Sequence, residues 1–107
     1  MKDLEISKEL FNEVTNSKCH EVFIKDEFVI AHSNLGMKMV NVYEFVFIKC
    51  KEWALTNGYF IYSTNELSFI KSLSLETIET FSNGKDTEIE CILKASEYIL
   101  KELNENR

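Results

Sequence analysis

The chain has 107 residues and a formal net charge of −6 at pH 7, with 12 basic and 18 acidic side chains. This length suits a single domain, residues 1–107, whose core is large enough to fold without a metal or a disulfide, so we expect no cofactor. Direct binding to nucleic acid is not expected either, because it requires clustered Lys and Arg side chains against the phosphates.

The first forty residues predict a helix followed by a β-hairpin. Ser7 is a typical N-cap for a helix that ends near Asn16. Residues 20–24 (HEVFI) and 28–32 (FVIAH) are rich in β-branched and aromatic side chains, which is typical of strands, and the polar KDE between them predicts the turn. Residues 34–38, which contain a glycine, are expected to form a loop.

Residues 41–58 (NVYEFVFIKCKEWALTNG) predict a complete helix with a cap at each end. Asn41 is a typical N-cap, and Glu44 stands where its side chain reaches back to Asn41. Gly58 supplies the left-handed residue that often ends a helix.

The second half of the chain predicts strands and a final helix. Residues 59–63 (YFIYS) are a strong strand candidate. Residues 66–74 also fit a helical spacing, but their serines and alternating side chains favour a strand, and residues 76–82 (ETIETFS) predict another. Thr87 with Glu90 forms a capping box, and the last helix has a stripe of apolar residues expected to face the core: Ile89, Ile92, Ala95, Ile99 and Leu103.

Together these elements predict an α+β fold in the order α-β-β-α-β-β-β-α. A mostly antiparallel sheet with helices packed on it accommodates that order.

The helix predicted at residues 41–58 is apolar on more than one side. At about 100° per residue, one broad face is expected to pack on the sheet, and it holds Val42, Tyr43, Val46, Phe47, Cys50, Trp53 and Ala54. Phe45, Ile48 and Leu55 fall roughly opposite, among charged residues. Either the N-terminal helix covers these three, or they form a binding surface that Tyr59 and Tyr62 extend.

No membrane anchor or secretion signal is expected. The longest apolar stretch falls far short of the roughly 18 residues of a membrane helix, and the first residues, MKDLEISKEL, are acidic and polar. Cys19, Cys50 and Cys91 lack a CxxC spacing, as is typical of reduced thiols. We therefore expect a cytoplasmic protein that does not bind membranes.

The sequence contains no catalytic or phosphate-binding motif, so an enzyme is not expected. Cys19, His20 and His32 lie at the ends of the predicted hairpin strands and offer the one alternative, a small metal- or ligand-binding site or an active site. Adjacent strand residues point to opposite faces, which disfavours convergence of Cys19 and His20.

Two blocks resemble small uncharacterised proteins of prophages and mobile elements. NVYEFVFIKCKEWALTNGY is similar to an "IYE, KCKEWA, GY" pattern, and DTEIECILKASEYIL is similar to "DTEPEAIFKACEWIL"; ISKELFNEV near the start belongs to the same resemblance. The chain departs from the pattern at Ile89, where the family has Pro, and at Val46 and Phe47, where it has Ala-His. The resemblance implies a phage accessory protein and brings no catalytic residues.

We therefore expect a non-enzymatic protein that acts by protein–protein binding. Its partner is either a host protein, for instance a component of a CRISPR or restriction defence system that it inhibits, or a second copy of itself in a homodimer. Mimicry of nucleic acid is a further alternative, because the C-terminal third carries −4 of the net charge of −6.

Overall fold

The computed structural model describes residues 4–63, 68–72, 77–81 and 88–106, and its α+β fold confirms the predicted class. The helices are α1 (Lys8–Thr15), a long helix made of α2 (Val42–Glu44), η1 (Phe45–Cys50) and α3 (Lys51–Thr56), and α4 (Glu88–Glu105). The strands are β1 (Glu21–Lys25), β2 (Phe28–Ser33), β3 (Gly36–Asn41), β4 (Tyr59–Ser63), β5 (Ser68–Ser72) and β6 (Thr77–Phe81).

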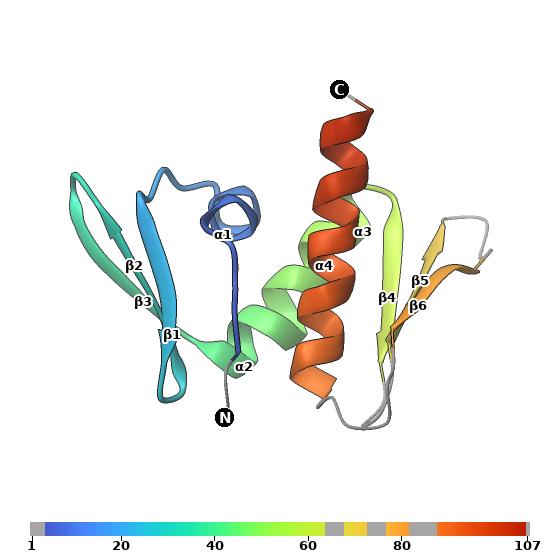
Figure 1. The fold of residues 1–107 in the computed structure, drawn as a ribbon, viewed down its shortest axis with the longest axis horizontal. Coiled ribbons are helices and arrows are strands. Elements are labelled where there is room, and N and C mark those ends of the chain that lie inside the picture. The colour runs from blue at the N-terminus through green and yellow to red at the C-terminus, as the bar shows by residue number, and fades with distance from the viewer. Residues whose placement is uncertain (1–3, 64–67, 73–76, 82–87, 107) are drawn as a thin grey trace.

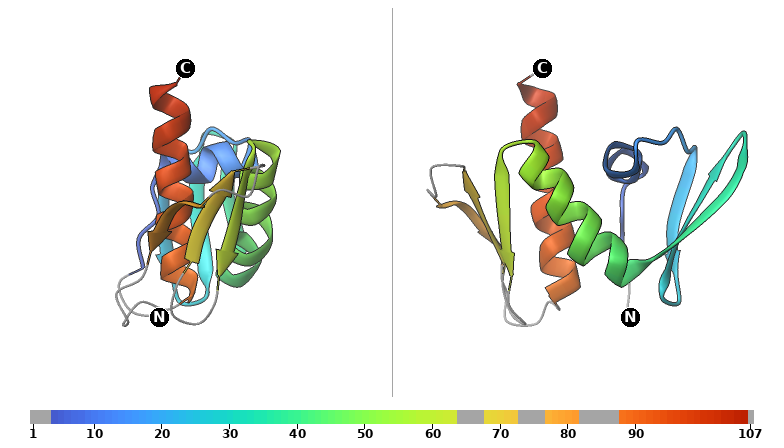
Figure 2. Two further views of the ribbon diagram at one scale, coloured as in Figure 1. Left: turned by 90° about the vertical axis from the view of Figure 1, so that its right-hand side faces the viewer. Right: turned by 180° about the vertical axis from the view of Figure 1, so that it is seen from behind.

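The described strands form two antiparallel sheets, in the orders β1-β2-β3 and β4-β5-β6. The helices lie between the two sheets (Figure 1). Both α1 and α4 contact the long central helix, α1 contacts β1, and α4 contacts all three strands of the second sheet. Viewed from behind, the central helix crosses from one sheet to the other (Figure 2). The core is therefore a helical layer that is covered by a sheet on each side.

The predicted hairpin is confirmed. Lys25 pairs with Phe28, so only two residues form the turn, and Asp26 adopts a left-handed conformation with φ 57°. Asp tolerates this conformation better than most residues because its short side chain bonds locally to the backbone. The backbone N–H of Val42 donates to the carbonyl of Glu27 over 2.8 Å, which ties the turn to the start of the central helix.

The loop expected at residues 34–38 is wrong in extent, because a third strand begins inside it. Ser33 pairs with Gly36, so the turn consists of Asn34 and Leu35, and β3 then pairs with β2 as far as Asn41. Gly36 has φ 128°, a conformation that glycine adopts without strain. Pairing with a neighbouring strand has overridden the weak strand preference of GMKMVN.

The predicted capping roles of Asn41 and Gly58 in the central helix are confirmed. The side chain of Asn41 accepts hydrogen bonds from the backbone N–H groups of Tyr43 at 2.9 Å and Glu44 at 3.3 Å. At the other end, Gly58 has φ 91° and its N–H donates to the carbonyl of Leu55 over 3.0 Å.

The middle of the central helix, η1, is a π-helical segment that a uniform helical wheel does not anticipate. A π turn spans one residue more than an α turn, so it changes which residues share a face. The buried residues are Val42, Phe45, Val46, Cys50, Trp53 and Ala54. Omitting one residue of η1 from the count gives these positions the 0, 3, 4, 7, 10, 11 spacing of a regular amphipathic α-helix. Phe45 thereby joins the core, and Tyr43 is left exposed.

The second sheet and the last helix follow the predictions. Strands form at Ser68–Ser72 and Thr77–Phe81, while the other residues of 66–74 and 76–82 lie outside the described part of the chain, as does the Thr87 cap. The apolar stripe of α4 is confirmed, with Ile89, Ile92, Ala95 and Ile99 buried and Leu103 partly buried.

Because α4 lies in the middle layer, its burial extends well beyond one stripe. Leu93, Ser96 and Leu100 are also buried. The carboxylate of Glu97 accepts two hydrogen bonds from Ser7, one from its backbone N–H at 3.1 Å and one from its hydroxyl at 2.7 Å. This contact holds the start of α1 against α4.

In the described part of the chain, no helix combines the length and the apolar character that crossing a membrane requires.

Candidate interaction surfaces

The first sheet has apolar side chains on both faces. Its inner face packs on the helices, with Val29 and Ala31 of β2 fully buried. Alternate residues point the other way, because successive side chains of a strand lie on opposite sides of the sheet. We call this second side the outer face; its residues are Glu21, Phe23, Lys25, Phe28, Ile30, His32, Met37, Met39 and Asn41.

The register of the strands arranges the outer face in rows. Phe23 pairs with Ile30, and Ile30 pairs with Met39, so these three form a central row across the sheet. Met39 is 53% exposed and Met37, beside His32, is 57% exposed. Phe23 and Phe28 are also exposed. The outer face therefore presents a contiguous apolar area to solvent.

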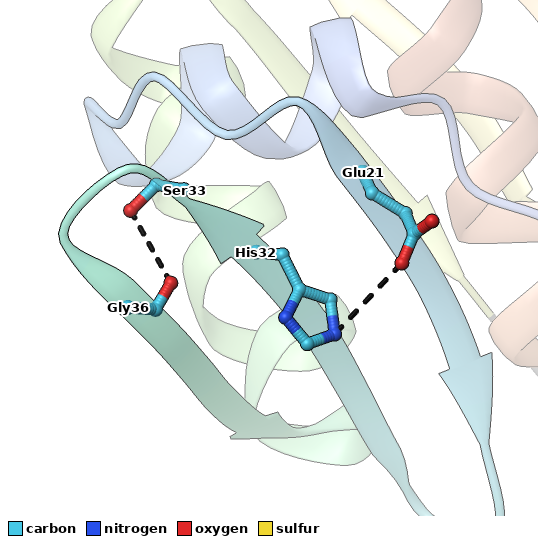
Figure 3. Close-up of polar contacts among 4 residues, drawn as sticks. All are labelled: Glu21, His32, Ser33 and Gly36. Carbon is cyan, nitrogen blue, oxygen red and sulfur yellow. Dashed lines mark hydrogen bonds and ion pairs between the residues drawn. The ribbon is translucent and has the colours of Figure 1, made fainter.

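Charged groups border this apolar area on β1. Glu21 and His32 are partners across the two strands, and the His32 Nε2 lies 3.8 Å from the Glu21 Oε1 (Figure 3). The imidazole ring also stacks on Phe23, with ring centroids 6.0 Å apart. Lys25 lies at the opposite end of β1 from Glu21. An acidic and a basic side chain thus flank Phe23 along one strand.

The turn between β2 and β3 presents a further apolar side chain to solvent. Leu35 at its tip is 100% exposed. The turn is ordered by the Ser33 hydroxyl, which accepts from the Leu35 N–H at 3.2 Å and donates to the Gly36 carbonyl at 3.4 Å (Figure 3). Leu35 is therefore held in solvent by an ordered turn.

Phe45 is not an interface residue, and this prediction is corrected. It is fully buried and its ring stacks on Phe11 of α1, with centroids 5.5 Å apart. The N-terminal helix covers it, which was one of the two alternatives. The extra residue in η1 brings Cys50, Trp53 and Ala54 to the same side of the helix as Phe45.

Ile48 and Leu55 do lie on the surface. Each is 50% exposed, on the side of the central helix away from the core. They are seven residues apart on the same helix and are separated by the exposed Glu52. They form a smaller apolar area than the outer face.

The two tyrosines of β4 face opposite ways. Tyr59 packs partly against the core, together with the buried Ile61. Tyr62 is exposed on the other face of the strand, where its ring lies 6.1 Å from that of Phe60. The five interface candidates, Phe45, Ile48, Leu55, Tyr59 and Tyr62, therefore do not form one surface.

The alternative site at Cys19, His20 and His32 is not assembled. Cys19 is buried, and its backbone N–H and carbonyl bond to the side chain of Asn12 at 2.8 and 2.9 Å. His20 is exposed, and its backbone N–H donates to the carbonyl of His32 over 2.9 Å. Across the residues that the structure describes, no three His, Cys, Asp or Glu side chains gather as a metal site would require.

The thiol of Cys50 is fully buried in the helical layer. Burial raises its pKa from 9.0 to about 12, a hydrogen bond with Ser96 lowers it in part, and the charge of Glu97 raises it. The thiol is therefore protonated at neutral pH, and a protonated thiol is a poor nucleophile. Cys50 acts as a small core residue.

Comparison of the chain with protein-family models, with curated proteins and with solved structures finds no match.

The sequence did contain a signal for the outer face, which the prediction did not use. Residues 22–24 and 28–31 are apolar at consecutive positions, so both sides of those strands are apolar. A two-sided apolar strand needs cover on both sides. Met37 and Met39 were missed because β3 was not predicted: Met37 fell in the loop expected at residues 34–38, and Met39 lay between that loop and the predicted helix.

Proposed function

We propose that the protein acts by binding another protein through the outer face of its β1-β2-β3 sheet, without catalysing a reaction. One observation supports this: the inner face of the sheet packs on the helices while the outer face leaves Phe23, Phe28, Met37 and Met39 exposed. Exposed apolar area costs roughly 25 cal/mol per Å², so a contiguous area of this kind often marks an interface.

The composition of the outer face also suits protein binding. Phe and Met are enriched in the centres of interfaces, and methionine adapts its shape to different partners. Glu21 and Lys25 supply the charged rim that such centres usually have. The resemblance to prophage proteins makes a host protein the heterologous partner to look for.

Affinity capture from lysates of cells that carry the gene tests this proposal. The wild type is compared with Met39→Lys, which places a charge in the central row, and with Ile48→Lys, an equally exposed control on the central helix. We expect quantitative mass spectrometry to find a protein that the wild type and Ile48→Lys capture equally and that Met39→Lys captures at least tenfold less. An untagged copy of the chain itself counts as such a protein. Equal capture by all three would contradict the proposal.

A further inference from the structure

On β1, opposite charges lie on either side of the central row of the outer face, Phe23–Ile30–Met39. On β1, Glu21 lies two residues before Phe23 and Lys25 lies two residues after it. The acid and the base are therefore at equal distances from the row, roughly 6.6 Å at the usual rise along a strand. A two-fold rotation about an axis along the row exchanges the two ends of β1.

We propose that the outer face binds the outer face of a second copy of this chain, about a two-fold axis that follows the central row. The proposal rests on the proposed function and names its partner. In this arrangement Phe23, Ile30 and Met39 each meet their own counterpart. Glu21 meets the partner's Lys25, and Lys25 meets the partner's Glu21.

Charge complementarity selects this arrangement over the other face-to-face pairing. An axis along the strands would place β1 over β3 of the second copy, with Glu21 against the partner's Met37 and Lys25 without an opposite charge. Removing a charge from water without a partner is costly. With the axis along the row, Glu21 and Lys25 each face an opposite charge, and the symmetry gives two such pairs in each dimer.

The spacing of packed sheets allows these contacts. Two sheets that pack face to face lie about 10 Å apart with their strands within about 30° of each other. Glu and Lys side chains together span such a gap. Two-fold pairing also requires only one self-complementary surface on the chain, and it is the commonest symmetry of homo-oligomers.

The size of the outer face predicts a weak dimer. Three strands about 4.8 Å apart and five residues of about 3.3 Å give a face of roughly 14 Å by 17 Å. The area of a face with these dimensions is smaller than the roughly 800 Å² that each partner contributes to a standard stable interface. We therefore expect weak, reversible dimerisation that is populated at high protein concentration.

Sedimentation equilibrium with charge-exchange variants tests the proposal. Glu21→Lys and Lys25→Glu each place like charges opposite each other, so each is expected to raise the dissociation constant at least tenfold. The double variant restores opposite charges and should return the constant to within about threefold of the wild type. Both sites are solvent-accessible, with the Glu21 side chain 61% exposed, so the fold should be kept, as circular dichroism would check.

Net charge alone predicts a different pattern. Glu21→Lys reduces the net charge from −6 to −4, which weakens general repulsion between copies. Glu52→Lys makes the same change on the exposed side of α3 and should not weaken the dimer. A wild type that stays monomeric at about 1 mM, or a double variant no tighter than the single variants, would overturn the proposal. Binding of a different protein through the outer face, seen in the capture experiment, would still support the proposed function.

Discussion

At the scale of single residues, Phe45 shows how one side chain changes the interpretation of a surface. A uniform wheel places it beside Ile48 and Leu55, but it stacks on Phe11 in the core. Ile48 and Leu55 are left as a small apolar area. Met37 and Met39, which have the stronger claim to a function, are exposed on β3, a strand that the sequence did not predict.

Cys50 carries a prediction about stability and pH. Burial raises its folded-state pKa to about 12, whereas the unfolded value is 9.0. Unfolding therefore releases a proton once the pH exceeds 9, and the free energy of unfolding should fall as pH rises toward 12. The fall that this thiol causes approaches about 1.4 kcal/mol per pH unit.

Urea unfolding of the wild type and Cys50→Ala at pH 8, 9, 10 and 11 measures this effect. The variant lacks the thiol, so its stability should decline less steeply above pH 9. The advantage of the wild type over the variant should therefore shrink with pH. Parallel profiles would show that the Cys50 thiol ionises equally in both states.

At the scale of elements, the π-helical segment η1 predicts that the central helix tolerates the deletion of one residue. Deleting the exposed Ile48 removes one residue from Phe45–Cys50 and leaves the buried positions at the spacing of a regular α-helix. We expect this variant to fold with unchanged helix content and to lose about 1 kcal/mol or less in the free energy of unfolding.

Deletion of Lys94, an exposed residue of α4, is the matched control. No π segment lies in α4, so the deletion rotates the following buried residues by about 100° and should unfold the protein. Circular dichroism and urea unfolding measure both variants. If the two deletions were equally damaging, η1 would not be an extra residue within an otherwise regular helix.

Some helices and strands could be predicted from the sequence and others could not. Helix ends could be predicted because a cap depends only on residues that are close in the sequence. Ser7, Asn41 and Gly58 mark helix ends as expected. The strand β3 was missed because its stability comes from pairing with β2 rather than from its own residues. The π segment was missed because its signal is a shift of one residue in the apolar spacing.

At the scale of the whole molecule, the arrangement of layers determines which faces are free. The strands form two sheets with the helices between them, so each sheet has one face on the core and one face directed outward (Figure 1). The sequence predicted an antiparallel α+β fold, but not that its strands divide into two sheets, each made of three consecutive strands. The candidate surface was missed because it exists only after β1, β2 and β3 are assembled in register.

Carbene footprinting of the bound protein tests most directly whether the outer face is the binding surface. Labelling of Met37 and Met39 is compared between the dilute free chain and the bound state, whether with a captured partner or at high concentration of the chain itself. Ile48 and Leu55, similarly exposed on the central helix, serve as internal references. We predict that binding reduces labelling of the two methionines severalfold and leaves the references unchanged. Unchanged methionine labelling in the bound state would contradict the assignment of the outer face as the binding surface.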